Sequence, residues 1–290
     1  MDTDKCSALI RVLELGSLSA AAEDLGYTPS GISRMMAALE SEVGFPLLIR
    51  SRDGIRPTPE CDSMLPQFRR LIRESSLTMQ MADSLRGAET GEVRVGIQYP
   101  SFYKPLSALI HDFTDRYPGI KVEIFEGMST VLADQLSARE LDICIISRRK
   151  GDFEWRSLVD DPMVLLVPAG HPLEKKGSAS VSNIRKEPFI LMFPGEETDS
   201  STYLTMNRID PDVRFRCHNM YAAYRMVGAG LGVTLDNSIF TAEYRPLFGD
   251  SVSTVTLEMP YVIPIGIAAA RTENRSPAAS RFIEMSYDYL

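Results

Sequence analysis

Side chains that build metal centres and catalytic sites are scarce in this sequence. The 290 residues include four cysteines and three histidines. The cysteines are scattered, with no CxxC pair and no cysteine–histidine cluster, which argues against a zinc site. His111, His171 and His218 have no nucleophile motif such as GxSxG beside them. We therefore expect no catalytic residue, no metal ion and no cofactor, and we expect that the protein is not an enzyme.

Long apolar runs and a secretory signal are missing as well. The best candidate for a membrane span, residues 261–270, is too short to cross a bilayer and contains Pro264. Residues 1–16 are acidic and amphipathic, unlike the start of a signal peptide. These features predict a cytoplasmic protein with no membrane partner.

Basic charge is also in short supply. The formal net charge is −8, and residues 1–60 carry six basic against nine acidic side chains. Bulk attraction to nucleic acid is therefore excluded, so any DNA binding must depend on where the charges lie. Four of those six basic residues fall between Arg34 and Arg56, which is the placement that DNA contact requires.

Residues 18–43 predict two short helices joined by a tight turn. The first has apolar residues at helical spacing, Ser19 as its N-cap and Gly26 as its stop. The second starts with Thr28 as N-cap and Pro29 in its first turn. Its outer face has short side chains and one arginine, as a recognition helix in a major groove requires. A helical hairpin with a plain solvent face is the alternative that this pattern leaves open. The outer-face residues are Ser30, Gly31, Ser33, Arg34 and Ala37.

A wing and a linker helix follow the helix pair. Residues 47–58 read as a β-hairpin around the turn Asp53-Gly54. With a further helix at residues 4–15, they predict a winged helix–turn–helix over residues 1–58. Residues 59–87 predict a long linker helix whose heptad-like apolar stripe favours pairing with another helix. The wing residues suited to contact backbone phosphates are Arg50, Arg52 and Arg56.

The remainder, residues 88–290, predicts an α/β domain of two lobes. Strands and helices alternate from residue 92 to 147 and again further on, which is typical of parallel sheets with right-handed crossovers. We expect lobe I to comprise residues 91–161 and 266–290, and lobe II residues 162–265. Ligands of such sheets bind beyond the C-terminal ends of the strands, so we expect a binding cleft between the lobes.

The chain as a whole resembles the LysR-type transcriptional regulators, and the resemblance runs nearly end to end. Each motif is weak alone, but the ordered set is specific. The motifs are Gly16-Ser17-Leu18-Ser19-Ala20-Ala21-Ala22, Leu25, Ser33-Arg34, Leu39-Glu40, Gly44, Pro46-Leu47, Arg50, Arg56, Thr58, Pro118-Gly119-Ile120, Leu141-Asp142-Ile143, His171-Pro172-Leu173 and Val227–Gly232.

The resemblance implies a winged helix–turn–helix, a linker helix and an effector domain like a periplasmic binding protein. It implies a transcriptional regulator controlled by a small molecule, a carboxylate or an aromatic compound, that binds between the lobes. It also implies double-stranded operator DNA, RNA polymerase and further copies of the chain, in a dimer or usually a tetramer, as partners. The effector would shift the shape of this oligomer on an imperfect palindrome.

The resemblance also transfers site residues. The DNA contacts fall on Thr28, Pro29, Ser30, Ser33 and Arg34, with wing support from Arg50, Arg52 and Arg56. The effector contacts fall around Ser101, Phe102, Met128, Ser129, Thr130, Thr202 and Asn219. Their hydroxyls suit an anionic effector, although ordinary helix caps are an equal alternative. Many family members carry a base-reading glutamine where this chain has Pro29, so selectivity here should depend more on the other contacts and on DNA shape.

Two other function classes fit the lobes alone. One is a solute-binding module for transport, against which the N-terminal winged unit and the missing signal argue. The other is an enzyme, which would need clustered acid and base groups in the cleft. A gel shift with upstream DNA separates the regulator from both.

Overall fold

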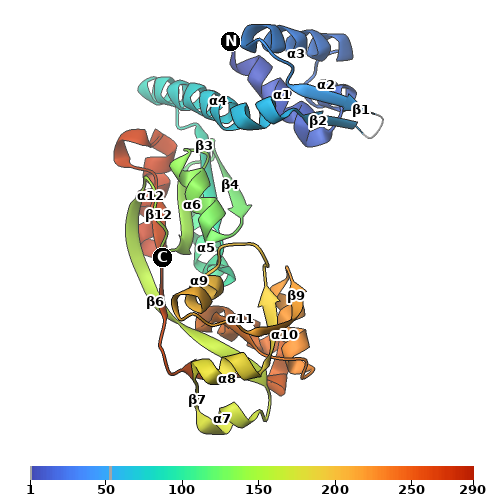
Figure 1. Ribbon diagram of the computed structural model, residues 1–290. Coiled ribbons are helices and arrows are strands. Elements are labelled where there is room, and N and C mark those ends of the chain that lie inside the picture. Colours follow the sequence, from blue (N-terminus) through green and yellow to red (C-terminus); the bar gives the residue numbers. More distant parts are fainter. Residues whose placement is uncertain (1, 52–53) are drawn as a thin grey trace.

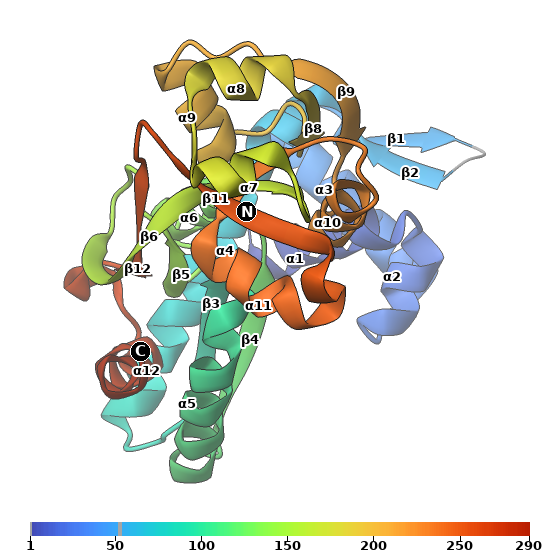
Figure 2. The same ribbon diagram turned by 90° about the horizontal axis from the view of Figure 1, so that it is seen from below.

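The N-terminal part is a three-helix unit with a two-stranded wing (Figure 1). The computed structural model describes residues 2–51 and 54–290, so Arg52, a predicted DNA contact, and Asp53 lie outside the described residues. Figure 2 shows the wing projecting away from the rest of the molecule. The elements are α1 (Thr3–Leu15), α2 (Leu18–Asp24), α3 (Pro29–Val43), β1 (Leu48–Ser51) and β2 (Gly54–Pro57).

The caps of these helices follow the sequence with one exception. The Oγ1 of Thr28 accepts a hydrogen bond from the Gly31 N–H at 3.1 Å and starts α3 as expected. The prediction that Ser19 caps α2 is wrong, because Ser17 does so by accepting from Ala20 N at 3.3 Å. Gly16 ends α1 in the left-handed conformation, so the next helix can begin at once.

The linker helix α4 (Pro59–Leu85) begins at the N-cap Thr58, as the sequence predicts. The first half of its apolar stripe packs on the winged unit, where Phe68 is buried and Ile72 is partly buried in the same core as α1 and α3. The second half is open, since Met79 and Met81 are each 56% exposed and Leu85 is 84% exposed.

Both lobes of the C-terminal part share one eight-stranded sheet. Its order is β4-β3-β5-β12-β6-β11-β7, with β10 also paired to β6. The long strand β6 joins the lobes, because its residues 154–162 pair with β12 and its residues 163–168 pair with β10 and β11. Figure 1 shows β6 running from one lobe into the other. The strands are β3 (Gly91–Ile97), β4 (Ile120–Glu126), β5 (Ile143–Ser147), β6 (Glu154–Pro168), β7 (Ser178–Ala179), β10 (Thr234–Asn237), β11 (Val252–Leu257) and β12 (Val262–Ala269).

Helices cover the sheet on both faces. In lobe I, α5 and α12 pack on one face and α6 on the other, so parallel β3, β4 and β5 are sandwiched as their apolar sequences require. Lobe II adds a second small sheet of β8 (Pro188–Met192) and β9 (Asp212–Cys217). The helices are α5 (Tyr103–Arg116), α6 (Ser129–Ser137), α7 (Pro172–Lys176), α8 (Val181–Lys186), α9 (Asp199–Met206), α10 (Met220–Gly228), α11 (Ser238–Phe248) and α12 (Pro277–Tyr289).

Two segments were not anticipated from the sequence. The helix α11 contains Pro246, which weakens the helical pattern. The first half of β6 carries charged residues and Pro162, and is held in the sheet by β12 from a hundred residues further on. Among the residues that the structure describes, no helix combines the length and apolarity of a membrane span.

Candidate functional site

The outer face of α3 presents small side chains around one arginine. Thr28, Pro29, Ser30 and Arg34 are exposed, and Ser33 is half-buried. The Nε of Arg34 donates a long hydrogen bond of 3.4 Å to the Ser30 carbonyl oxygen. No carboxylate among the described residues pairs with Arg34. Its charge is therefore available to an anionic partner.

The two described wing arginines lie on opposite faces of the hairpin. Arg50 stands across from Ile55, and Arg56 stands across from Ile49. Side chains of directly opposed residues share a face and successive residues alternate, so the two guanidinium groups diverge. Ile55 packs toward the core, which places Arg56 on the outward face. The structure therefore does not bring Arg50 and Arg56 together on one face.

The C-terminal strand ends of lobe I are closed by an internal hydrogen-bond cluster around Ser129. The Oγ of Ser129 donates to Gln98 Oε1 and accepts from Ser147 N at 2.9 Å. Ser129 is only 1% exposed. This hydroxyl is thus already satisfied by lobe I itself.

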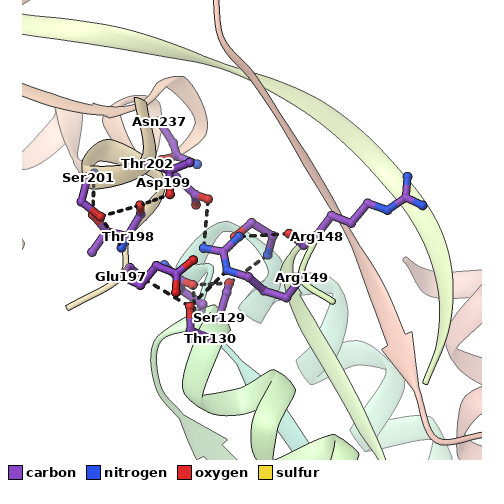
Figure 3. A network of polar contacts seen from close by, with 12 residues as sticks. Ser129, Thr130, Arg148, Arg149, Glu197, Thr198, Asp199, Ser201, Thr202 and Asn237 are labelled. Carbon is purple, nitrogen blue, oxygen red and sulfur yellow. Dashed lines mark hydrogen bonds and ion pairs between the residues drawn. The ribbon is translucent and has the colours of Figure 1, made fainter. Parts of the chain in front are cut away.

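A second network crosses from lobe I to lobe II (Figure 3). The Nη2 of Arg149 lies 3.0 Å from Asp199 Oδ1, and its Nε donates to Thr130 Oγ1 at 3.1 Å. Thr130 Oγ1 in turn donates to the Glu197 carbonyl oxygen at 3.2 Å. Asp199 opens α9, and Arg149 follows β5, so the contacts tie the two lobes together. The Arg148 side chain points away from this network.

An open cavity of about 320 Å³ lies between the lobes beside this network. Its lobe I wall includes Gln98 and Met128, and its lobe II wall includes Phe193 and Asn219. Asn219 caps α10, accepting from Ala222 N at 3.0 Å. We call this space the interlobe cavity. Its lining residues are Gln98, Pro100, Gly127, Met128, Phe193, His218, Asn219, Met220, Tyr221, Phe240 and Tyr244.

Of the seven predicted effector contacts, Met128 and Asn219 line this cavity and the other five do not. Phe102 packs between the cores of the two lobes. The Oγ1 of Thr202 donates to the Thr198 carbonyl oxygen of its own helix at 2.9 Å. The Oγ of Ser101 is buried without a hydrogen-bond partner among the described residues.

Several lining residues carry no signal in the sequence. Phe240 and Tyr244 lie on α11, the helix that the sequence pattern did not reveal. Phe193 directly follows β8 and has a φ of 51°, an uncommon conformation for a bulky residue. Gln98 directly follows β3, and only this position after a strand could have indicated it.

Two protein-family models match this architecture. Residues 4–62 match the bacterial regulatory helix-turn-helix protein model of the lysR family, and residues 86–290 match the LysR substrate binding domain. The chain belongs to the LysR family. It is therefore a DNA-binding transcriptional regulator with an effector-binding domain, and not an enzyme, as the sequence predicted.

Named relatives of this LysR-family chain are distant. It is 32% identical to the regulator CbbR of Rhizobium meliloti over 191 residues, which cover 64% of this chain and 60% of CbbR. It is 23% identical to the uncharacterized regulator YvbU of Bacillus subtilis, over 99% of this chain and 98% of YvbU.

Solved LysR-family structures share its fold over the whole length. Full-length OxyR from Pseudomonas aeruginosa matches with a TM-score of 0.70 and 21% identity, covering 100% of this chain and 94% of OxyR. Full-length CbnR in complex with its target DNA matches with a TM-score of 0.66 and 19% identity, covering 100% of both chains.

Lobe II of this LysR-family regulator holds a fully buried carboxyl next to the cavity. Tyr224 donates its hydroxyl proton to Asp236 Oδ2 at 2.9 Å. Burial raises the pKa of Asp236 from 3.8 to about 7, and the neighbouring charges of Asp161 and Asp199 act in the same direction. The carboxyl therefore keeps its proton in the folded chain to a higher pH than in the unfolded chain.

Replacing this carboxyl should flatten the pH dependence of stability. Because the unfolded chain releases the proton first, the wild type loses stability as the pH rises from about 4 to about 7. In Asp236→Asn we expect the fall in Tm between pH 5 and pH 8 to be smaller by about 5 °C. Differential scanning calorimetry at both pH values measures it. The exposed Asp210→Asn should behave as wild type, and equal pH dependence in all three chains would contradict the assignment.

Proposed function

We propose that this regulator holds its operator through the outer face of α3 and the wing. The single observation that supports this most strongly is the exposed Arg34. It stands among small side chains and has no ion pair within the described part of the chain. An arginine fork in the major groove binds guanine edges or phosphate oxygens, and short neighbours allow the close approach that it needs. Thr28, Pro29, Ser30 and Ser33 would then contact the groove surface around it.

The wing contributes phosphate contacts in this proposal, with Arg56 on the outward face of the hairpin as the principal one. Arg50 would contact a phosphate only from the other face. Arg52 stays a predicted contact from the sequence. Because phosphate contacts position a protein on DNA without reading its sequence, we expect the wing to set affinity and α3 to set selectivity.

The effector is proposed to bind in the interlobe cavity. Its walls combine aromatic rings with the Gln98 amide and the N-terminus of α10 at Asn219, which suits an aromatic or small carboxylate compound. Met128 and Asn219 would contact the ligand directly. Thr130 would act through its contacts with Arg149 and Glu197, while Ser129, Phe102 and Thr202 would hold the cavity walls in place. Ser101 follows the lining residue Pro100, and its buried hydroxyl has no hydrogen-bond partner within residues 2–51 and 54–290.

Further partners belong to the same proposal. The exposed Met79, Met81 and Leu85 on the second half of α4 support pairing of linker helices in a homo-oligomer, a dimer or a tetramer. RNA polymerase is the expected downstream partner, and the cytoplasm the expected compartment. The proposed units are residues 1–58, 59–87 and 88–290. The proposed lobe boundaries at 161/162 and 265/266 then fall inside β6 and β12, the strands shared by both lobes.

A thermal-shift screen tests the effector site. Small carboxylates, phenols and amino acids are added to the full chain, and a true ligand at 100 times its Kd should raise Tm by about 5–10 °C. Met128→Trp fills the cavity and should abolish the shift. Val131→Trp, at an exposed position on α6, should keep the thermal shift. A ligand whose shift survives Met128→Trp, in a protein with wild-type Tm before addition, would place the effector elsewhere.

A further inference from the structure

A second cavity lies at the junction of the winged unit, the linker helix and lobe I. Its volume is about 410 Å³, within the range of small-molecule sites. Figure 1 shows α4 running between the winged unit and lobe I. The apolar part of the wall comes from all three, with Ile10 on α1, Ile72 on α4 and Phe125 on β4. It shares no lining residue with the interlobe cavity, so we treat it separately and call it the junction cavity.

Most charges on the wall of the junction cavity are paired within the protein. Arg11 pairs with Asp24 at 2.7 Å and with Glu14 at 3.0 Å. Arg94 pairs with Glu92. These groups bind each other and leave little net charge for a ligand.

Two lining groups are different. Arg69 is exposed on α4, and within the described ranges 2–51 and 54–290 it has neither an ion pair nor a side-chain hydrogen bond. The second group is the Glu140 carboxylate, which also has no ion pair among those residues. The wall therefore offers one available cation and one available anion.

Arg73 adds an unsatisfied donor one helical turn from Arg69. Its Nη2 donates to Asp142 Oδ1 at 2.5 Å, and the side chain is only 5% exposed. Its Nε has no hydrogen-bond partner among the described residues. A buried N–H without a partner destabilises the folded chain, so an acceptor supplied beside it would be stabilising. Residues four apart lie on the same helix face, which places both guanidinium groups toward the same side of α4.

We propose that the junction cavity is a second ligand site, which binds a small monocarboxylate with an apolar body. The carboxylate would lie between Arg69 and Arg73, because charge-assisted hydrogen bonds to guanidinium groups are the strongest contacts that this wall offers. The apolar body would cover Ile10, Ile72 and Phe125. Glu140 repels a second negative charge, so a dicarboxylate is disfavoured.

Occupation of this site would fix the winged unit against lobe I. A ligand that contacts α1, α4 and lobe I together binds only when the three are arranged as here, so it stabilises that arrangement by mass action. The orientation of α3 relative to the effector domain would then respond to this ligand independently of the interlobe cavity.

Isothermal titration of 3-phenylpropionate into the full chain tests the proposal. Arg69→Met keeps most of the side-chain length and removes the charge, and should weaken binding at least tenfold. Arg70→Met is the matched control, because Arg70 is the exposed neighbour on the same helix and does not line the cavity. Wild type, Arg70→Met and Met128→Trp should bind equally, and phenylsuccinate should bind more weakly than 3-phenylpropionate.

Three results would overturn the proposal. They are no binding of 3-phenylpropionate to the wild type at millimolar concentration, equal affinity in wild type and Arg69→Met, and loss of binding in Met128→Trp alone. The last result would move the ligand to the interlobe cavity and leave the effector proposal intact. If the effector response is lost while Arg69-dependent binding remains, the effector proposal fails and the proposal for the junction cavity stands.

Discussion

Arg34→Ala is expected to weaken operator binding by at least about 30-fold, while the fold and effector binding remain as in the wild type. One groove contact of this kind contributes about 1–3 kcal/mol, and the two copies in the proposed dimer would contribute twice that. The side chain is exposed, and its one hydrogen bond to a described residue is long, at 3.4 Å, so its removal leaves no buried group there unpaired. A gel shift with DNA from upstream of the protein's own gene measures the effect.

The control for Arg34 is Arg245→Ala. Arg245 is an exposed arginine on α11 in lobe II, far along the chain from the winged unit, and its loss changes the net charge equally. We expect this variant to bind DNA as the wild type does. An unchanged gel shift for Arg34→Ala would show that α3 does not read the operator through this residue.

Arg73→Ala is expected to destabilise the junction of α4 and lobe I by about 3–5 kcal/mol. The variant leaves Asp142 buried without the guanidinium that pairs with it at 2.5 Å. Asp142 cannot simply turn away, because its other oxygen accepts the Arg94 N–H at 2.8 Å. Urea unfolding followed by the fluorescence of Trp155, the single tryptophan of the chain, measures the loss.

A matched pair on the same junction provides the control. Glu74 on α4 pairs with Arg139 of lobe I at 2.6 Å, but both side chains are substantially exposed. Exposed ion pairs contribute about 0–1 kcal/mol, so Glu74→Ala should cost much less than Arg73→Ala. The double variant Arg73→Met with Asp142→Asn removes both charges and keeps an acceptor for the Arg94 N–H, so it should recover much of the loss. Equal costs for Arg73→Ala and Glu74→Ala would contradict the role of burial.

The winged unit was the most predictable part of the chain, because its signals are local. Thr28 and Pro29 mark the start of α3, and Thr58 marks the start of α4. Each signal is adjacent in sequence to the helix that it starts. The wrong prediction for the cap of α2 shows the limit of such local signals, because Ser17 and Ser19 offer the same hydroxyl two residues apart. In the structure Ser17 is the cap, directly after Gly16, which ends α1 in the left-handed conformation.

The candidate site was less predictable, because it is assembled from distant segments. Arg73 meets Asp142 across 69 residues, and Arg149 meets Asp199 across a lobe boundary. No periodicity encodes such pairs. The apolar stripe of α4 illustrates the same limit, since its pattern does not say that Phe68 packs on the winged unit while Met79 stays exposed.

We propose that a ligand in the interlobe cavity changes how the winged units hold DNA. Footprinting of the upstream DNA by the full chain, with and without the ligand that raises Tm most in the thermal-shift screen, tests it most directly. We predict that the ligand changes the length or the intensity of the protected region for the wild type, and leaves the footprint of Met128→Trp unchanged. Identical wild-type footprints with and without a saturating ligand would show that the interlobe cavity does not control DNA binding.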